Sequence, residues 1–287
     1  MKGLSTSCCR SPSFRIARLW RSGDVYTRGG KYTRAAILLE AAVEGADQTM
    51  ALSQPVFAAL LNSLAVVYKH VGNFGKAEGL YRRALEIVEE VCGSDDLLAA
   101  TINHNLGGLE HARGRHSAGE PFARRALVLR EKHLGPNHVA VAADMAALAA
   151  LLQGQRKHTE AEMLYRRALT IFETAYGTEH EEVALNIGNL ATLKQAAGNP
   201  RAAEALYRRA LALKTRSLGS SHPSVGATAN NLATLLYQEQ RFNEAATLVR
   251  TALSILEASE GSEHPNTNVC RISLARILAA NHVSVQL

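Results

Sequence analysis

The sequence predicts an all-α protein: a right-handed superhelical solenoid of antiparallel helix pairs, with six repeats and a C-terminal capping helix. Three observations predict this fold. The pentapeptide YRRAL occurs at 81–85, 165–169 and 207–211, with ARRAL at 123–127, always a multiple of 42 residues apart. The same step relates two further sets, Leu64, Leu106, Leu148, Leu190 and Leu232, and Gly93, Gly135, Gly177, Gly219 and Gly261. Similarity at a fixed period of this length is typical of repeat architectures.

The repeats fill almost the whole chain. Pro55, Pro223 and Pro265 occupy one position of the period and fix the boundaries. We expect a disordered basic leader at 1–12, a divergent first repeat at 13–54, five regular repeats at 55–96, 97–138, 139–180, 181–222 and 223–264, and a capping helix with a tail at 265–287.

Each repeat is predicted to form two helices. In the repeat that begins at 181, apolar residues recur over 183–193 at the spacing of a one-faced helix. Gly198 ends this helix, Asn199 is a favourable N-cap, and Pro200 suits the first position, where its missing N–H would have no partner. The second helix follows and ends at Gly219. Because one such pair cannot bury its apolar stripe alone, the pairs must stack.

The arginines of the pentapeptide are predicted to lie on the outer face of the second helices. A glutamate stands four residues before the first arginine of each pair, as in Glu78 and Arg82, Glu120 and Arg124, Glu162 and Arg166, and Glu204 and Arg208. This order favours ion pairs of about 0.2–0.5 kcal/mol along a helix. The stripe is therefore interpreted as a solvated structural face, with binding to an acidic partner or to nucleic acid as the alternative.

No arrangement of residues points to catalysis, a metal or a cofactor. His138, His180, His222 and His264 recur once per repeat. Neighbouring helices are about 8–10 Å apart, whereas zinc ligands converge to about 2 Å from the metal, so these histidines are interpreted as turn residues. No nucleophile stands beside a base, and no glycine-rich phosphate loop is present. We therefore predict that the protein is not an enzyme and binds no cofactor.

The repeat resembles a known family. Leu64, Ala65, Tyr68, Gly72 and Phe74, followed by Ala77, Tyr81 and Ala84, have the spacing of the tetratricopeptide repeat. The 42-residue unit with NNLATLL at 230–236, YRRAL and LGSSHP at 218–223 is similar to the kinesin light chain subclass. The resemblance covers roughly residues 13–281. It implies a concave groove, lined by the first helix of each repeat, that holds extended peptides.

Polar residues recur on the inner face of the predicted first helices and form the candidate site. They are Asn62, Lys69, Asn105, Asn189, Thr192, Gln195, Asn230, Asn231, Thr234 and Tyr237. An asparagine amide carries a donor and an acceptor, so a row of amides can pair with an extended backbone. Hydrogen bonding between neighbouring helices is the alternative. The resemblance favours peptide contact, above all for Asn189, Asn230 and Asn231. Ala143, Ala146, Ala147 and Ala150 interrupt the row with an apolar floor.

The predicted function is a non-catalytic scaffold that binds an extended peptide, acidic or aromatic in character, of a partner protein. A self-assembling solenoid is the alternative, and nucleic-acid binding is the least favoured. The chain carries a net charge of +6, but five basic residues precede the first acid, Asp24, so residues 24–287 carry only +1.

The sequence also bears on location. The longest apolar run near the middle, MAALAALL, is far shorter than the roughly 20 residues that span a bilayer. The four cysteines have no disulfide or metal spacing, which favours a reducing compartment, the cytoplasm. The basic, serine-rich start of the chain leaves organelle targeting as a less favoured alternative.

Overall fold

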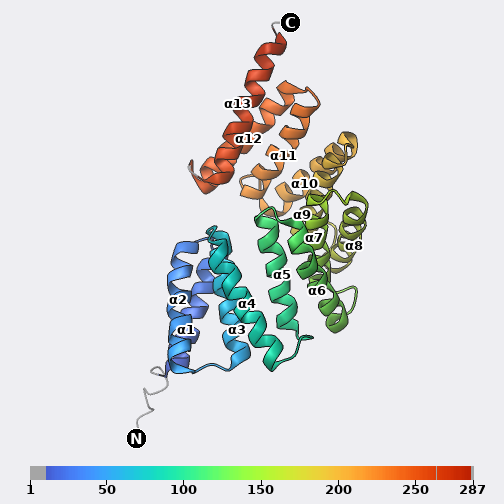
Figure 1. Ribbon diagram of the computed structural model, residues 1–287. Coiled ribbons are helices and arrows are strands. Elements are labelled where there is room, and N and C mark those ends of the chain that lie inside the picture. Colours follow the sequence, from blue (N-terminus) through green and yellow to red (C-terminus); the bar gives the residue numbers. More distant parts are fainter. Residues whose placement is uncertain (1–10, 263, 286–287) are drawn as a thin grey trace, which may run out of the picture. The chain divides into compact units, whose positions relative to one another are not determined.

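The computed structural model describes residues 11–262 and 264–285, and every regular element in this part of the chain is an α-helix (Figure 1). The helices are α1 (Pro12–Arg28), α2 (Tyr32–Thr49), α3 (Gln54–His70), α4 (Phe74–Val91), α5 (Leu97–Ala112), α6 (His116–Leu134), α7 (Val139–Gly154), α8 (His158–Tyr176), α9 (Glu181–Ala196), α10 (Pro200–Leu218), α11 (Pro223–Gln238), α12 (Phe242–Glu260) and α13 (Pro265–Val285). Residues 1–10 of the predicted leader lie outside the described residues, and Pro12 already belongs to α1.

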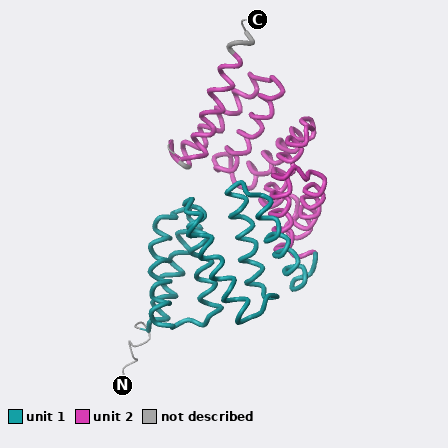
Figure 2. Tube along the Cα trace, in the orientation of Figure 1, with its two compact units in different colours: residues 1–136 teal, residues 137–287 magenta. Residues whose placement is uncertain are grey.

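The chain divides into two compact units, residues 1–136 with α1–α6 and residues 137–287 with α7–α13 (Figure 2). Within each unit, the odd-numbered first helices pack against the even-numbered second helices that follow them. Each second helix also contacts the next first helix of its unit, as α2 contacts α3 and α8 contacts α9. Within a unit, neighbouring first helices also touch one another directly. The prediction of an all-helical fold of stacked helix pairs is confirmed.

The recurring pentapeptide contributes buried residues to the core of the helix pairs that contain it. Its tyrosines, Tyr81, Tyr165 and Tyr207, are at most 2% exposed, and its alanines, Ala84, Ala168 and Ala210, are fully buried. A second set of small residues at one phase, Ala35, Ala77, Ala161, Ala203 and Ala245, is also fully buried. Because an alanine occupies little space, the helices of a pair can approach closely at these positions.

The recurring histidines cap the first helices. In His138, His180, His222 and His264, the ring Nδ1 accepts a hydrogen bond from the backbone N–H two residues later, at 3.1–3.3 Å. These bonds satisfy amides that have no partner inside the helix. Asn199 caps α10 as predicted, accepting from the N–H of Ala202 at 3.2 Å, and Pro200 opens that helix. The histidines lie at the predicted turns, and their repetition has a structural cause.

The four predicted ion pairs within second helices are confirmed. Arg82, Arg124, Arg166 and Arg208 lie 2.8–2.9 Å from the glutamate four residues earlier. Three of these glutamates also bind a basic residue of the next first helix or the turn after it. Glu78 pairs with Arg113 at 2.6 Å, and Glu162 with Lys194 and Glu204 with Arg241 at 2.7 Å. The glutamate row therefore joins consecutive repeats.

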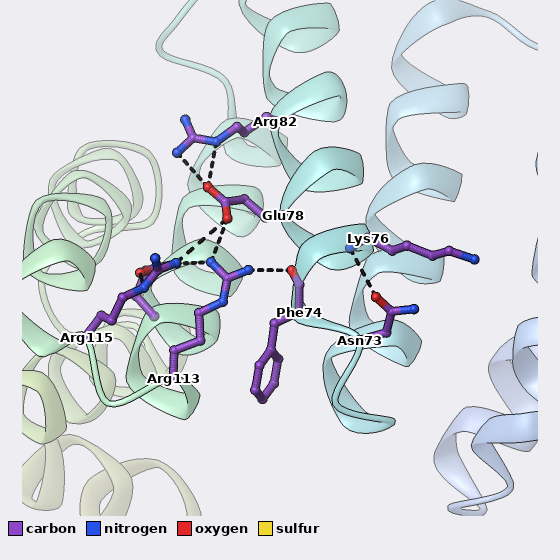
Figure 3. Close-up of polar contacts among 8 residues, drawn as sticks. Asn73, Phe74, Lys76, Glu78, Arg82, Arg113 and Arg115 are labelled. Carbon is purple, nitrogen blue, oxygen red and sulfur yellow. Dashed lines mark hydrogen bonds and ion pairs between the residues drawn. The ribbon is translucent and has the colours of Figure 1, made fainter.

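Arg113 lies at the centre of the best-enclosed of these junctions (Figure 3). Its side chain is only 13% exposed, and Nη1 lies 2.6 Å from Glu78 and 2.8 Å from Glu110. Its Nη2 donates to the backbone carbonyl of Phe74 at 2.7 Å. Hydrogen bonds from Arg113 and then from Arg82 lower the pKa of Glu78. One guanidinium thus links α4 to the end of α5.

Candidate functional site

Hydrogen bonds join neighbouring first helices at a fixed offset of 43 residues, one more than the period. Trp20 Nε1 donates to Ser63 Oγ at 3.0 Å, and Asn105 Nδ2 donates to Asn62 Oδ1 at 2.8 Å. In unit 2, Gln195 Nε2 donates to the side-chain oxygen of Gln238 at 2.8 Å. Each such bond, which we call a rung, uses side chains of two adjacent first helices.

Asn62 and Asn105 form one rung of unit 1 and are both partly buried. Their contact is a hydrogen bond between neighbouring helices, which is the alternative to peptide binding that the sequence left open. The bonded Asn62 oxygen and Asn105 amide nitrogen are committed to the stack, so these two residues support the architecture of unit 1.

Asn189 and Asn231 occupy the same phase as Asn105 but have no rung. The positions 43 residues earlier are Ala146 and Gly188, neither of which carries a polar side chain. Within the described residues, neither asparagine amide has a hydrogen-bond partner. Asn231 is exposed and Asn189 is partly exposed. A Cβ added at Gly188 would meet no atom within 4 Å, so the space beside it is open.

Thr192 and Gln195 hold a buried tyrosine of the second helix. Thr192 Oγ1 lies 3.1 Å from the Tyr207 hydroxyl, which donates to Gln195 Oε1 at 2.9 Å. Burial raises the pKa of the Tyr207 hydroxyl, so it remains a neutral donor. Because Gln195 also reaches Gln238, these side chains form one continuous network along α9–α11. Gln238 was not predicted as a site residue, because the offset of 43 residues that joins it to Gln195 differs from the 42-residue period of the sequence.

The remaining predicted residues of α11, Asn230, Thr234 and Tyr237, are less exposed than Asn231. Asn230 is only 8% exposed, and its Oδ1 is buried without a hydrogen-bond partner. Thr234 donates to the backbone carbonyl of Asn230 at 2.9 Å, and the Tyr237 ring lies 5.7 Å from that of Phe242. One residue along a helix turns the side chain by about 100°, which separates the buried Asn230 from the exposed Asn231.

The predicted alanine floor lies on α7. Ala143 is exposed, and Ala146, Ala147 and Ala150 are partly buried. Leu185 on the adjacent helix α9 is 49% exposed and lies one turn before Asn189. Unit 2 therefore places apolar surface on α7 and α9, one turn of α9 away from the unpaired amide of Asn189.

The arginine stripe is neutralised by carboxylates. Besides the pairs within second helices, the second arginine of the pentapeptide bonds to the preceding repeat, as Arg83 does with Asp47 at 2.8 Å and Arg209 with Glu173 at 3.0 Å. A guanidinium already paired in this way offers less to a phosphate, which weighs against nucleic-acid binding.

Within residues 11–262 and 264–285, no group of three or more His, Cys, Asp and Glu side chains is placed to hold a metal ion. None of the helices described there combines the length and apolar character needed to cross a membrane.

Comparisons with known proteins agree with this architecture. A family model described as tetratricopeptide repeat matches residues 56–132, 98–174, 141–216 and 224–282. The crystal structure of BtubC (BKLC) from P. vanneervenii is similar, with 25% sequence identity and a TM-score of 0.60 over 89% of this chain and 94% of that chain.

Two other solved structures share the fold. A putative kinesin light chain of Podosopora anserina with nearly identical TPR-like repeats has 22% identity and a TM-score of 0.59 over 72% of this chain and 99% of that chain. A Rap protein complexed with Competence and Sporulation Factor has 15% identity and a TM-score of 0.63 over 96% of this chain and 77% of that chain. A comparison with curated proteins finds no match.

Proposed function

The chain belongs to the tetratricopeptide repeat family, and on this premise we propose that it is a non-catalytic scaffold that binds an extended peptide of a partner protein. Repeats of this family typically serve protein–protein interaction. The observation that carries the proposal is the pair of unpaired amides on Asn189 and Asn231, one repeat apart. The equivalent Asn105 bonds to a neighbouring helix, so the rungs account for one asparagine of this phase and leave two without a structural partner.

The spacing of the two amides suits an extended chain. First helices of adjacent repeats are about 8–10 Å apart, and an extended chain advances about 3.4 Å per residue. Asn189 and Asn231 would therefore meet peptide groups about three residues apart. Each amide can donate to a backbone carbonyl and accept from a backbone N–H.

The alanine floor supplies the apolar part of the contact. Ala147 leaves room above α7 at the phase where the neighbouring repeats carry Asn105 and Asn189, and Leu185 adds exposed apolar surface on α9. An apolar side chain of the ligand would rest there while its backbone pairs with Asn189. Burying one such side chain contributes about 1.5–3 kcal/mol.

A second candidate function, self-assembly, is favoured by one feature of α13. Val269 and Ile272 on this terminal helix are 55% and 54% exposed. Stacking of two chains through this face predicts light scattering that rises with concentration and falls after polar substitution of Ile272 and Leu274. Scattering that stays at the monomer value would exclude this candidate.

A reducing setting, the cytoplasm, is part of the proposal. Cys92 and Cys270 are free thiols. Cys270 is fully buried and its thiol donates to the backbone carbonyl of Val249, which gives it a packing role that needs no disulfide.

The test uses a peptide selected from a displayed random library against the wild-type protein, with affinity measured by fluorescence anisotropy. Asn189→Ala with Asn231→Ala is expected to weaken binding at least tenfold, since each lost amide contact contributes about 1 kcal/mol. The matched control, Asn62→Ala with Asn105→Ala, removes a rung and is expected to lower stability instead. Unchanged affinity in the first variant would refute the proposal.

A further inference from the structure

We infer that one face of α1 is a contact surface for a lipid bilayer with anionic headgroups. Its residues are Phe14, Arg18, Arg21, Val25 and Arg28, and we call this surface the α1 face. It belongs to unit 1, whereas the unpaired amides of the proposed peptide contact belong to unit 2. Bilayer binding therefore goes beyond the proposed function and does not depend on it.

The five side chains of the α1 face share one side of the helix. They are alternately four and three residues apart, which is the spacing of a single stripe along a helix. All five are exposed, and the apolar members Phe14 and Val25 are 46% and 54% exposed. The opposite side of α1 packs against α2, where Ile16 and Gly23 are buried. The α1 face is therefore the side of this helix that solvent reaches.

The arginines of the α1 face have no carboxylate partner. In the part of the chain that the structure describes, none of the three forms an ion pair. Asp24, the one acid of α1, hydrogen-bonds with Ser63 and Trp20 and feels the charge of Arg28 without pairing with it. All four pentapeptide arginines of α4 and α6, by contrast, are paired with carboxylates. The positive charge of the α1 face is therefore available to an external anion.

Acids on the helices packed against α1 are engaged elsewhere or absent. The three acids of α2 each have another partner: Glu40 accepts from Tyr68, Glu44 accepts from Gln48 at 3.2 Å, and Asp47 pairs with Arg83 at 2.8 Å. Helix α3, the other neighbour of α1, contains no Asp or Glu. An anionic surface would therefore supply the counter-charge that the protein itself does not place beside the α1 face.

The apolar side chains favour a bilayer over nucleic acid. Phe14 lies one turn before Arg18, and Val25 lies one turn after Arg21, so both stand among the arginines. On a bilayer, arginines bind headgroup phosphates through their long stems, while the apolar side chains enter the boundary of the acyl chains. The phosphates of a nucleic acid would engage the arginines and leave Phe14 and Val25 in water.

The test measures binding of the whole chain to phosphatidylcholine vesicles with and without an equal amount of phosphatidylserine. Wild-type protein is expected to bind the mixed vesicles at least about tenfold more tightly. Arg18→Gln with Arg21→Gln is expected to weaken this binding about 25-fold, since each arginine near an anionic surface contributes about fivefold, or about 1 kcal/mol. The matched control, Arg201→Gln with Arg250→Gln, changes the net charge equally at exposed positions of unit 2 and is expected to alter it less than about twofold.

Two further measurements separate a bilayer from other polyanions. Phe14→Ser with Val25→Ser is expected to weaken binding to the mixed vesicles about tenfold, because these side chains leave water only on a bilayer. The same variant is expected to bind a fluorescein-labelled DNA duplex as the wild type does. Trp20, the single tryptophan, lies on α1, so its fluorescence is expected to fall when the mixed vesicles carry dansyl-labelled lipid.

Three results would overturn the inference. They are wild-type binding that does not depend on phosphatidylserine, equal losses in the two arginine variants, and full vesicle binding after loss of Phe14 and Val25. The third result, combined with DNA binding that falls in the Arg18 and Arg21 variant, would assign the α1 face to nucleic acid. Because these four side chains are exposed, each variant is expected to keep the circular dichroism spectrum of the wild type.

Discussion

Two adjacent glycines of α5 give a sharp test of the packing. Gly108→Ala removes a helix-interior glycine, and the new Cβ would make only an ordinary contact, 3.7 Å from Lys69 Nζ. We expect a gain in the free energy of unfolding of about 0.5–1 kcal/mol. At Gly107 the same Cβ would stand 3.3 Å from the Ala123 Cβ and 3.4 Å from its backbone nitrogen on α6.

The backbone of α6 cannot move aside to relieve this close contact, as the end of a flexible side chain could. Overpacking of this kind costs typically 1–3 kcal/mol, which exceeds the gain from removing a glycine. Gly107→Ala is therefore expected to lower the free energy of unfolding by about 1 kcal/mol.

Urea unfolding followed by tryptophan fluorescence suits this comparison. The single tryptophan, Trp20, lies in unit 1 and donates a rung hydrogen bond to Ser63. Unfolding followed by circular dichroism on the same samples reports on both units. A Gly107→Ala variant as stable as the wild type would refute the close approach of α5 and α6. A Gly108→Ala variant less stable than the wild type would contradict the ordinary contact expected beside Lys69.

Three further predictions concern caps and ion pairs. His222→Ala is expected to cost about 1 kcal/mol in urea unfolding, whereas His222→Asn, which can still accept from the Ser224 N–H, keeps most of it; equal losses would contradict the cap. Arg113→Ala is expected to cost about 2 kcal/mol, and a loss below about 0.5 kcal/mol would contradict its role. Basic partners lower the pKa of three glutamates from 4.5, so the stability they add is present above about pH 4.5 and is lost as pH falls through the folded values. Substituting Gln for all three, Glu78, Glu162 and Glu204, should flatten the acidic part of the plot of urea midpoint against pH. An unchanged plot would contradict the contribution of these ion pairs to stability.

The fold could be predicted from the sequence because the pattern that specifies each helix recurs every 42 residues. Each 42-residue unit carries its own apolar faces, caps and helix ends, as at Asn199 and Pro200, so local chemistry sets each helix. The ion pair between Glu78 and Arg82 could be predicted in the same way, since both residues lie on one helix.

Contacts between repeats were harder to predict. The offset of 43 residues depends on how far one helix pair rotates against the next, and no single repeat contains that rotation. The contact of Arg83 with Asp47 and the links made by Arg113 have the same origin.

The candidate site shows the same difference between what one repeat determines and what contacts between repeats determine. Sequence periodicity placed Asn105, Asn189 and Asn231 at one phase and Asn62 at the position before it, because the pattern shows residue type and phase only. The structure separates two amides bonded to each other from two without partners. Peptide contact by Asn189 and Asn231 remains a prediction.

Side-chain amide NMR of uniformly ¹⁵N-labelled protein tests the central claim most directly. On titration with the library-selected peptide, the NH₂ resonances of Asn189 and Asn231 are expected to shift, while those of Asn62 and Asn105 stay in place because that pair remains bonded. Shifts confined to Asn62 and Asn105, or none at any of the four residues while the peptide binds, would contradict the account.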